Sequence, residues 1–312
     1  MAVAPGPALA MLRGFAARPS LAPMFDLDAR LRLMDELGAS YVQVLTWSLP
    51  PIEQVATGQT GLDLARLAND NMVELVARYP DRFVGFAAAL PMDDPDAALR
   101  ELERAVQQLG ALGVQVLTNA NGRPVDDPRY EPLWGQLSAL DRTLWVHGAR
   151  RSITPDYEGE QLSRFGLWAA LGWPYEMGLF SARMVASGIL DRHPDLRIIL
   201  HHSGGMTATY SRRVMASWLE LQQPAPEDQA AYAALRRPVA EYFSLFYADT
   251  SGQTPIAIEA ALKFFGIEHV LLGSDMPFVP LGGHLETLNR LDLSTDDRAL
   301  LLGGNARRIL GL

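Results

Sequence analysis

Seven short apolar runs recur along the chain, separated by stretches with helical periodicity. Hydrophobicity that is nearly continuous within a run is typical of parallel strands, because helices cover both faces of such a sheet. Alternating strands and helices predict an α/β fold with a parallel sheet and no break between domains. The predicted strands are Tyr41–Thr46, Phe83–Ala88, Val114–Leu117, Leu144–His147, Arg197–His201, Leu245–Asp249 and Val270–Gly273.

Signals for helix ends lie between these runs. Asp94 followed by proline predicts a helix start, and Gly110 follows the last apolar residue of that helix. A second predicted helix, Thr254–Phe265, ends at Gly266, which favours a C-terminal cap. Ser294 with Asp297 is typical of a capping arrangement before the last helix.

Four of the runs lead directly into polar residues, which are His147, His201 with His202, Asp249, and Asp275 in the segment Gly273–Pro277. The carboxyl ends of parallel strands form the ligand side of an α/β fold. A carboxylate there is costly to bury unless a metal or a proton donor faces it. These converging strand ends predict a metal enzyme.

The composition limits which metal chemistry is open to the chain. There are no cysteines among the 312 residues, which excludes disulfides, thiolate metal sites, iron–sulfur clusters and cysteine nucleophiles. Imidazole and carboxylate are the remaining ligands, and they suit zinc or manganese. Such a metal would activate water or polarise a carbonyl group, while a second histidine moves the proton.

Other function classes lack their sequence features. A formal charge of −9 without a basic run argues against nucleic-acid binding. No uncharged apolar stretch reaches the roughly 18 residues that span a bilayer, and no basic segment precedes the apolar start. We expect a soluble, cytoplasmic protein without membrane or nucleic-acid partners. Serine-hydrolase and nucleotide-binding motifs are also missing.

The six histidines differ in context. His193 is predicted to lie on the surface, His269 to be structural or superficial, and His284 to cap a loop. His147 closes a strand, so a core histidine bonded to a carbonyl is the alternative to a metal ligand. His201 and His202 alternate, so one can face the barrel mouth and the other the surrounding layer.

Two irregular segments, Thr118–Pro132 and Arg150–Pro174, follow strand ends and are rich in Gly, Pro, Asn and Asp. Long loops on that side of a barrel hold substrate contacts. We expect both segments to shape the pocket, with Trp173, Tyr175 and Glu176 among the residues that line it.

The chain resembles the amidohydrolase-related (amidohydrolase 2) family of metal-dependent barrels. The likeness is strongest to the branch with aminocarboxymuconate semialdehyde decarboxylase and γ-resorcylate decarboxylase, and it runs from about Phe25 to the end of the chain. The matching segments are Arg32–Gly38, Arg82–Gly85, Gly172–Glu176, His201–Gly205, Tyr247–Thr250, Gly273–Pro277 and Gly304–Leu310.

The resemblance implies roles for individual residues. His147 and Asp275 match metal ligands of the family, and His202 matches its catalytic histidine, with His201 as the rival for that position. Arg213 lies where the family keeps an arginine that binds a substrate carboxylate; a helix-surface arginine is the alternative. The implied cofactor is a divalent metal, zinc first and manganese second, and relatives are often homodimers.

One feature of the family is missing from the chain. Its first strand carries His-x-His or Glu-x-His, yet no histidine precedes His147 and the first 30 residues contain no good strand. We therefore expect a single domain over residues 1–312, a distorted (β/α)8 TIM barrel without its first strand. Residues 1–24 match poorly and are candidates for disorder.

Three functions stay open at this point. The first is a metal-dependent decarboxylase acting on a small carboxylate substrate, a carbon–carbon lyase. The second is a metal-dependent hydrolase of an ester, lactone or amide. The third is a truncated, weakly active or non-catalytic chain, because His147 and Asp275 alone would hold a metal poorly.

Overall fold

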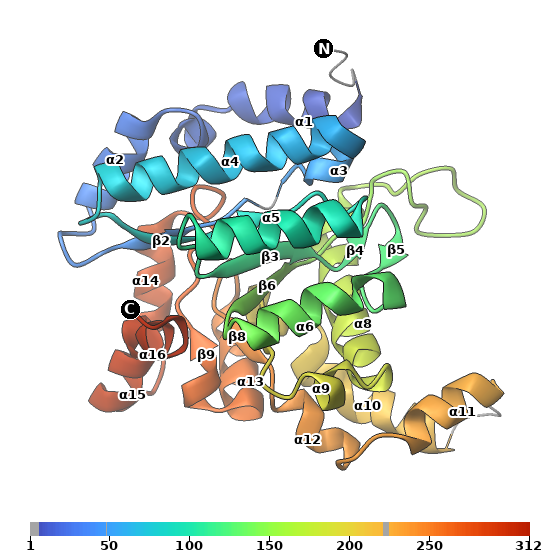
Figure 1. Ribbon diagram of the computed structural model, residues 1–312. Coiled ribbons are helices and arrows are strands. Elements are labelled where there is room, and N and C mark those ends of the chain that lie inside the picture. Colours follow the sequence, from blue (N-terminus) through green and yellow to red (C-terminus); the bar gives the residue numbers. More distant parts are fainter. Residues whose placement is uncertain (1–5, 48, 221–224) are drawn as a thin grey trace. The chain divides into compact units, whose positions relative to one another are not determined.

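The structure is a computed structural model that describes residues 6–47, 49–220 and 225–312 (Figure 1). The chain forms two compact units. The first comprises Met1–Val116, Ser274–Leu291 and Leu312, and the second comprises Leu117–Gly273 and Asp292–Gly311. The prediction of one domain stays a prediction, because compactness does not show whether either unit folds alone.

The first unit is built on three parallel strands in the order β1-β2-β3. The long helix α4 packs along β2, whose Phe83 and Phe86 are fully buried (Figure 1). The buried Asn69 side chain of α4 forms hydrogen bonds with the backbone N–H and the carbonyl oxygen of Ala89 in β2. The elements are α1 (Pro7–Ala16), η1 (Pro19–Met24), α2 (Leu27–Asp35), β1 (Gln43–Leu45), α3 (Ile52–Val55), α4 (Gly58–Arg78), β2 (Phe83–Ala89), α5 (Pro95–Gln107), β3 (Gly113–Leu117) and α14 (Leu281–Asn289).

The second unit holds four parallel strands in the order β6-β7-β8-β9. Leu144 pairs with Ile198, and both side chains are buried in its core. The elements are β4 (Asn119–Ala120), β5 (Arg123–Pro124), η2 (Pro128–Tyr130), α6 (Glu131–Ala139), β6 (Thr143–His147), α7 (Leu167–Ala170), α8 (Gly172–Ala186), α9 (Ile189–Arg192), β7 (Arg197–Leu200), η3 (His202–Gly204), α10 (Thr207–Glu220), α11 (Pro226–Ala233), α12 (Val239–Phe243), β8 (Tyr247–Asp249), α13 (Pro255–Phe265), η4 (Ile267–His269), β9 (Val270–Leu271), α15 (Thr295–Ala299), η5 (Leu300–Gly304) and α16 (Asn305–Leu310).

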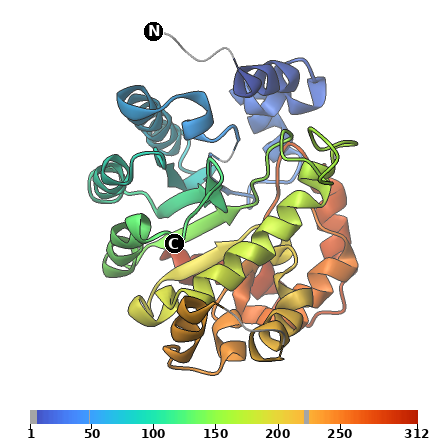
Figure 2. The same ribbon diagram turned by 90° about the vertical axis from the view of Figure 1, so that its right-hand side faces the viewer.

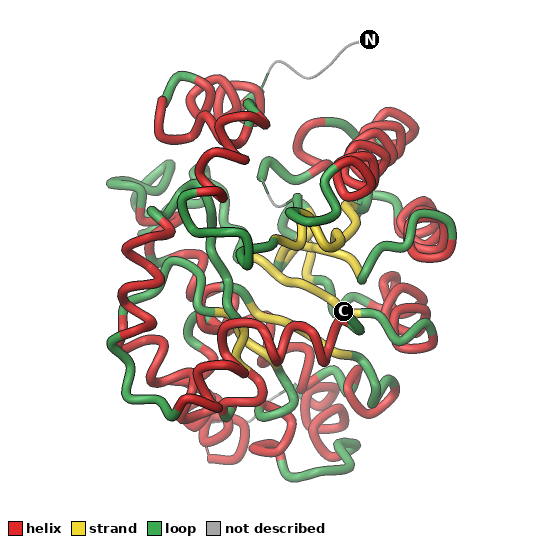
Figure 3. Tube along the Cα trace, turned by 90° about the vertical axis from the view of Figure 1, so that its left-hand side faces the viewer, coloured by secondary structure: helices red, strands yellow, loops and turns green. Residues whose placement is uncertain are grey.

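Helices surround these strands. Helix α8, yellow-green in Figure 2, packs against α10 and reaches β6. Within each unit, the helices, in red in Figure 3, flank the strands, in yellow, as expected for continuous apolar runs. No helix in the described part of the chain has both the length and the apolar character needed to cross a membrane.

All seven predicted strands are present, with ends shifted by a few residues. The structure adds the hairpin β4–β5 inside the segment Thr118–Pro132, which was predicted to be irregular. Among the described residues before Gln43 there is no strand, and residues 7–24 of the segment predicted as a candidate for disorder form α1 and η1. Residues 1–5 of that segment lie outside the described residues.

The three predicted helix starts and the end at Gly266 are confirmed, whereas α5 already ends at Gln107 and the last predicted helix is divided into α15, η5 and α16. The side chains of Asp94, Thr254 and Ser294 accept hydrogen bonds from the first turns of α5, α13 and α15. The prediction that the segment Arg150–Pro174 is irregular was wrong in its last part, because α7 occupies Leu167–Ala170 and α8 begins at Gly172. Proline fits in the first helical turn, where its missing N–H would have no partner inside the helix.

Candidate active site

Two strand ends of the second unit bring together the histidines that the sequence singled out. His147 is the last residue of β6, and His202 opens the short helix η3 directly after β7 and His201. His202 and Ser203 have φ angles of 57° and 55°, in the left-handed region. This conformation costs about 1–2 kcal/mol for each residue other than glycine, so the surrounding contacts must hold the turn.

The two rings face each other through their Nε2 atoms, which lie 3.0 Å apart. His147 Nδ1 lies 2.8 Å from the carbonyl oxygen of Gly148, and His202 Nδ1 lies 3.0 Å from that of Ser251. A carbonyl oxygen only accepts, so each Nδ1 donates and carries the proton. In neutral rings both Nε2 atoms then present lone pairs to each other. The arrangement is favourable only with a cation there, a proton or a metal ion.

His147 has the properties of a metal ligand. Its side chain is buried, and burial lowers its pKa well below the ordinary value, helped by the neighbouring His202 and His201. The neutral ring keeps a lone pair at Nε2, which is the form that binds metals. Metal-binding histidines commonly donate the other N–H to a backbone carbonyl, as His147 does to Gly148.

Asp249 at the end of β8 places a buried carboxylate next to His201 and His202. Its Oδ2 pairs with His201 Nδ1 at 2.5 Å, and its Oδ1 accepts from the backbone N–H of His202 at 2.8 Å. Burial alone would raise the pKa of Asp249, but His201 and the other donors outweigh it and hold that pKa well below its usual range. The structure thus gives the two histidines different partners: His201 faces Asp249, and His202 faces His147.

Two glycines of the predicted motifs permit this close packing. A Cβ on Gly148 would lie 2.6 Å from Cβ of Trp173. A Cβ on Gly273 would lie 2.6 Å from the Asp249 carboxylate, so this glycine lets β9 approach the end of β8. Gly273 in the Gly-Ser-Asp sequence after the last strand therefore has a packing role.

The first turn of α8 lies against the site. Trp173 meets the His147 ring edge to face, with centroids 5.0 Å apart. Glu176 accepts a hydrogen bond from Asn119 at 3.2 Å, and burial raises its pKa. The structure places Trp173 next to His147, whereas Tyr175 lines a separate cavity.

The other predicted metal ligand, Asp275, belongs to the first unit. Its φ angle is 51°, and its carbonyl oxygen accepts from the backbone N–H of Phe278 at 2.8 Å. Within the described ranges, no group of three or more His, Asp or Glu side chains is arranged to hold a metal ion. The role of Asp275 as a ligand stays a prediction.

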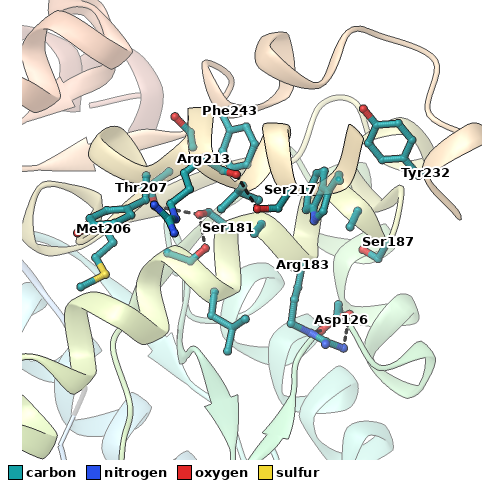
Figure 4. Close-up of a pocket in the computed structure, with 18 of the residues that line it drawn as sticks. Asp126, Ser181, Arg183, Ser187, Met206, Thr207, Arg213, Ser217, Tyr232 and Phe243 are labelled. Atoms are coloured by element: carbon teal, nitrogen blue, oxygen red, sulfur yellow. Dashed lines mark hydrogen bonds and ion pairs between the residues drawn. The ribbon is translucent and has the colours of Figure 1, made fainter. Parts of the chain in front are cut away.

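Arg213 lies on α10 beside a cavity of 880 Å³ among α8, α10, α11 and α12 (Figure 4). Trp218, Tyr232 and Phe243 give this cavity an aromatic wall. His147, His201, His202 and Asp249 are not among its described lining residues. The predicted contact between Arg213 and a substrate carboxylate stays a prediction.

The remaining histidines are structural. His193 was predicted at the surface, but its ring is largely covered and its Nε2 lies 2.7 Å from a Glu131 oxygen. His284 was predicted to cap a loop and instead lies buried in α14. His269 stacks on Tyr247 with centroids 4.3 Å apart, which agrees with its predicted structural role.

Comparison with known proteins places the chain in a family. The sequence pattern of the amidohydrolase family matches residues 19–312, so the chain belongs to that family. γ-Resorcylate decarboxylase from Rhodococcus jostii (strain RHA1) is 33% identical over 301 residues, covering 91% of this chain and 87% of the relative. 2-Amino-3-carboxymuconate-6-semialdehyde decarboxylase from Dictyostelium discoideum is 30% identical over 295 residues, covering 92% and 77%.

Solved structures agree. Dihydroxybenzoic acid decarboxylase from Polaromonas sp. JS666, with bound manganese and the inhibitor 2-nitroresorcinol, has a TM-score of 0.75 and 30% identity, covering 91% of this chain and 86% of that one. The predicted fold class, a distorted α/β barrel of the metal-dependent hydrolase type, is confirmed, and so is the likeness to metal-dependent decarboxylases.

Proposed function

We propose that this chain is a metal-dependent decarboxylase that acts on a small carboxylate substrate. The observation that carries the proposal is the facing pair of Nε2 atoms of His147 and His202. One lone pair is suited to a metal ion and the other to a proton. Relatives that are named as decarboxylases favour this function over others.

His147 and, as the resemblance implies, Asp275 would hold a divalent metal, whose positive charge would favour binding of a carboxylate substrate. His202 carries a transferable proton at Nε2, while its Nδ1–H stays bonded to the Ser251 carbonyl oxygen. Trp173 limits the space around His147.

In the reaction, the π electrons of the substrate take up the proton from His202 Nε2 at the carbon that carries the carboxylate. The bond from that carbon to the carboxylate then breaks, and its electron pair restores the π system. Carbon dioxide leaves, with the proton in its place. His202 ends neutral and takes a new proton from solvent.

The test is a decarboxylation assay with γ-resorcylate, the compound in the relative's name. The purified chain is incubated with manganese or zinc, and carbon dioxide and resorcinol are measured together. Matched release of both supports the proposal. Metal-dependent cleavage of an ester or lactone panel without carbon dioxide release would favour the hydrolase, and a chain that holds no metal after dialysis would favour the non-catalytic alternative.

We propose zinc as the resident metal, with manganese as the alternative. The donor set of imidazole and carboxylate suits both ions, and the solved relative from Polaromonas holds manganese. Elemental analysis of protein purified from cells grown with both metals decides between them. About one ion per chain is the expected amount for a single site.

We propose, as the resemblance implies, that Arg213 binds the substrate carboxylate; its exposed side chain can form a charge-assisted pair. Arg213→Gln should raise KM about tenfold or more while kcat changes less. Arg212, its exposed neighbour outside the cavity lining, provides the matched control as Arg212→Gln. Equal effects of both substitutions would contradict the assignment.

Two further properties are the oligomeric state of the protein and its location in the cell. We propose a homodimer, as the resemblance implies, and sedimentation velocity over a range of concentrations tests it. A cytoplasmic location is also proposed, and fractionation of the source cells with an antibody against the chain tests that expectation.

A further inference from the structure

The buried carboxylate of Asp249 holds two segments that fix the ring of His202. Its Oδ1 accepts from the backbone N–H of His202 at 2.8 Å and from that of Ser251 at 3.0 Å. The Ser251 hydroxyl donates to the same oxygen at 2.6 Å. The Ser251 carbonyl oxygen in turn accepts from His202 Nδ1 at 3.0 Å. His202 is therefore restrained at its backbone N–H, which bonds Asp249 directly, and at its ring Nδ1, which bonds Ser251. Ser251 is in turn bonded to Asp249.

These restraints act on a turn that would not persist alone. His202 and Ser203 have left-handed backbone angles, and Gly204 and Gly205 follow with φ angles of 73° and 57°. The glycines adopt positive φ freely, but His202 and Ser203 need contacts that over-determine their conformation. One such contact is the hydrogen bond from the His202 N–H to Asp249 Oδ1, at the start of the turn. All three groups bonded to this oxygen are donors, from which a carboxylate oxygen accepts.

The carboxylate itself has little room to move. Gly273 packs so closely that a Cβ there would lie 2.6 Å from Oδ2. On another side His201 Nδ1 lies 2.5 Å from the same oxygen, and the His201 backbone N–H donates to the Val146 carbonyl oxygen of β6. Asp249 thus connects the ends of three neighbouring strands, β7, β8 and β9.

We propose that Asp249 is a positioning residue, which holds His202 in its left-handed turn with Nε2 directed at His147. The inference rests on the proposed function for the role of His202 and goes beyond it by assigning the group that orients the proton donor. Because all its neighbours donate, the position requires an acceptor at both oxygens. An amide would present N–H to at least one N–H donor.

The test is the tautomer of each histidine ring, read by long-range ¹H–¹⁵N correlation spectra of metal-free protein and assigned with single His→Gln variants. In the wild type His202 should carry its proton on Nδ1. Asp249→Asn keeps one oxygen for His202 and Ser251, so the His202 pattern should stay while His201 changes tautomer. Asp249→Ala should give averaged tautomers at His202. The control is Asp195→Asn, an exposed aspartate before β7.

A single Nδ1–H tautomer that persists at His202 in Asp249→Ala would overturn the proposal. Where that variant does not fold, a changed His202 pattern in Asp249→Asn would overturn it, because the amide oxygen keeps the three donors of Oδ1. With an active substrate, Asp249→Ala should lower kcat about tenfold or more while KM stays within about twofold, as expected for a misplaced proton donor, and Asp249→Asn should lower kcat less. If the wild type decarboxylates nothing, the proposed function fails, whereas the ring spectra still decide whether Asp249 orients His202.

Discussion

At the scale of single residues, a substitution of His202 tests whether the proposed proton transfer can be separated from metal binding. His202→Ala should lower turnover by about 10²–10⁴-fold, the usual range for losing a general acid, while the metal content stays unchanged. Steady-state rates and elemental analysis of the same sample check this. His269→Gln, which removes a ring stacked on Tyr247 instead, is the control for loss of an imidazole. Turnover that survives in His202→Ala would show that another group delivers the proton.

Glu53 in α3 is a buried acid whose titration should appear in the stability of the protein. Burial raises its pKa to about 7, and the nearby Asp93 carboxylate adds to the rise against a backbone hydrogen bond. The folded state therefore keeps a proton between pH 4.5 and about 7 that the unfolded state has lost. By linkage, the stability that this proton gives is complete below pH 4.5 and is lost as the pH rises through 7.

Glu53→Gln removes this titration. Relative to the variant, the wild type should lose up to about 3 kcal/mol of unfolding free energy between pH 4 and pH 8. Urea unfolding at a series of pH values measures the difference. Glu74→Gln, on the exposed side of α4, is the matched control. A difference between wild type and Glu53→Gln that does not change with pH would rule out a buried, late-titrating Glu53.

At the scale of elements, a polar network ties α4 to the end of β2. The Asn69 amide donates to the Ala89 carbonyl oxygen at 3.0 Å and to Glu101 at 2.8 Å, and its oxygen accepts from the Ala89 N–H at 2.8 Å. Asn69→Asp keeps the shape but turns a donor into a charged acceptor beside Glu101.

The expected cost of Asn69→Asp is about 3 kcal/mol or more of unfolding free energy, because the buried partners lose their donor. Chemical denaturation measures it. Asn71→Asp, two positions along and exposed, should change stability by less than about 0.5 kcal/mol. Similar midpoints for both variants would contradict the structural role of Asn69.

The strands could be predicted from sequence because burial on both faces leaves a continuous apolar run, as in Thr143–His147. The start of α8 could not, since glycine and proline at Gly172 and Pro174 are typical of loops as well as of first helical turns. His147 and His202 could be singled out by their places after strands. The role of Asp249 could not, because its partners come from segments distant in the chain, and only the fold joins them.

At the scale of the whole molecule, the facing imidazoles connect metal binding to stability. Two lone pairs 3.0 Å apart repel each other in the neutral metal-free protein, so a cation removes a cost that folding otherwise carries. A ligand that binds only the folded state adds about 2.7 kcal/mol at a free concentration of one hundred times Kd. Metal should therefore raise the thermal unfolding midpoint by several degrees.

The variants are best compared by how far metal shifts the thermal unfolding midpoint, not by the midpoint itself. Zinc or manganese should raise the midpoint of the wild type and of His269→Gln, whose ring lies outside the facing pair. The rise should vanish in His147→Ala, and Asp275→Asn should reduce it if that carboxylate is also a ligand. Calorimetry with and without metal, at constant pH, measures each shift. An equal rise in His147→Ala would mean that the ion binds elsewhere, because the variant lacks the Nε2 lone pair that the proposed site requires.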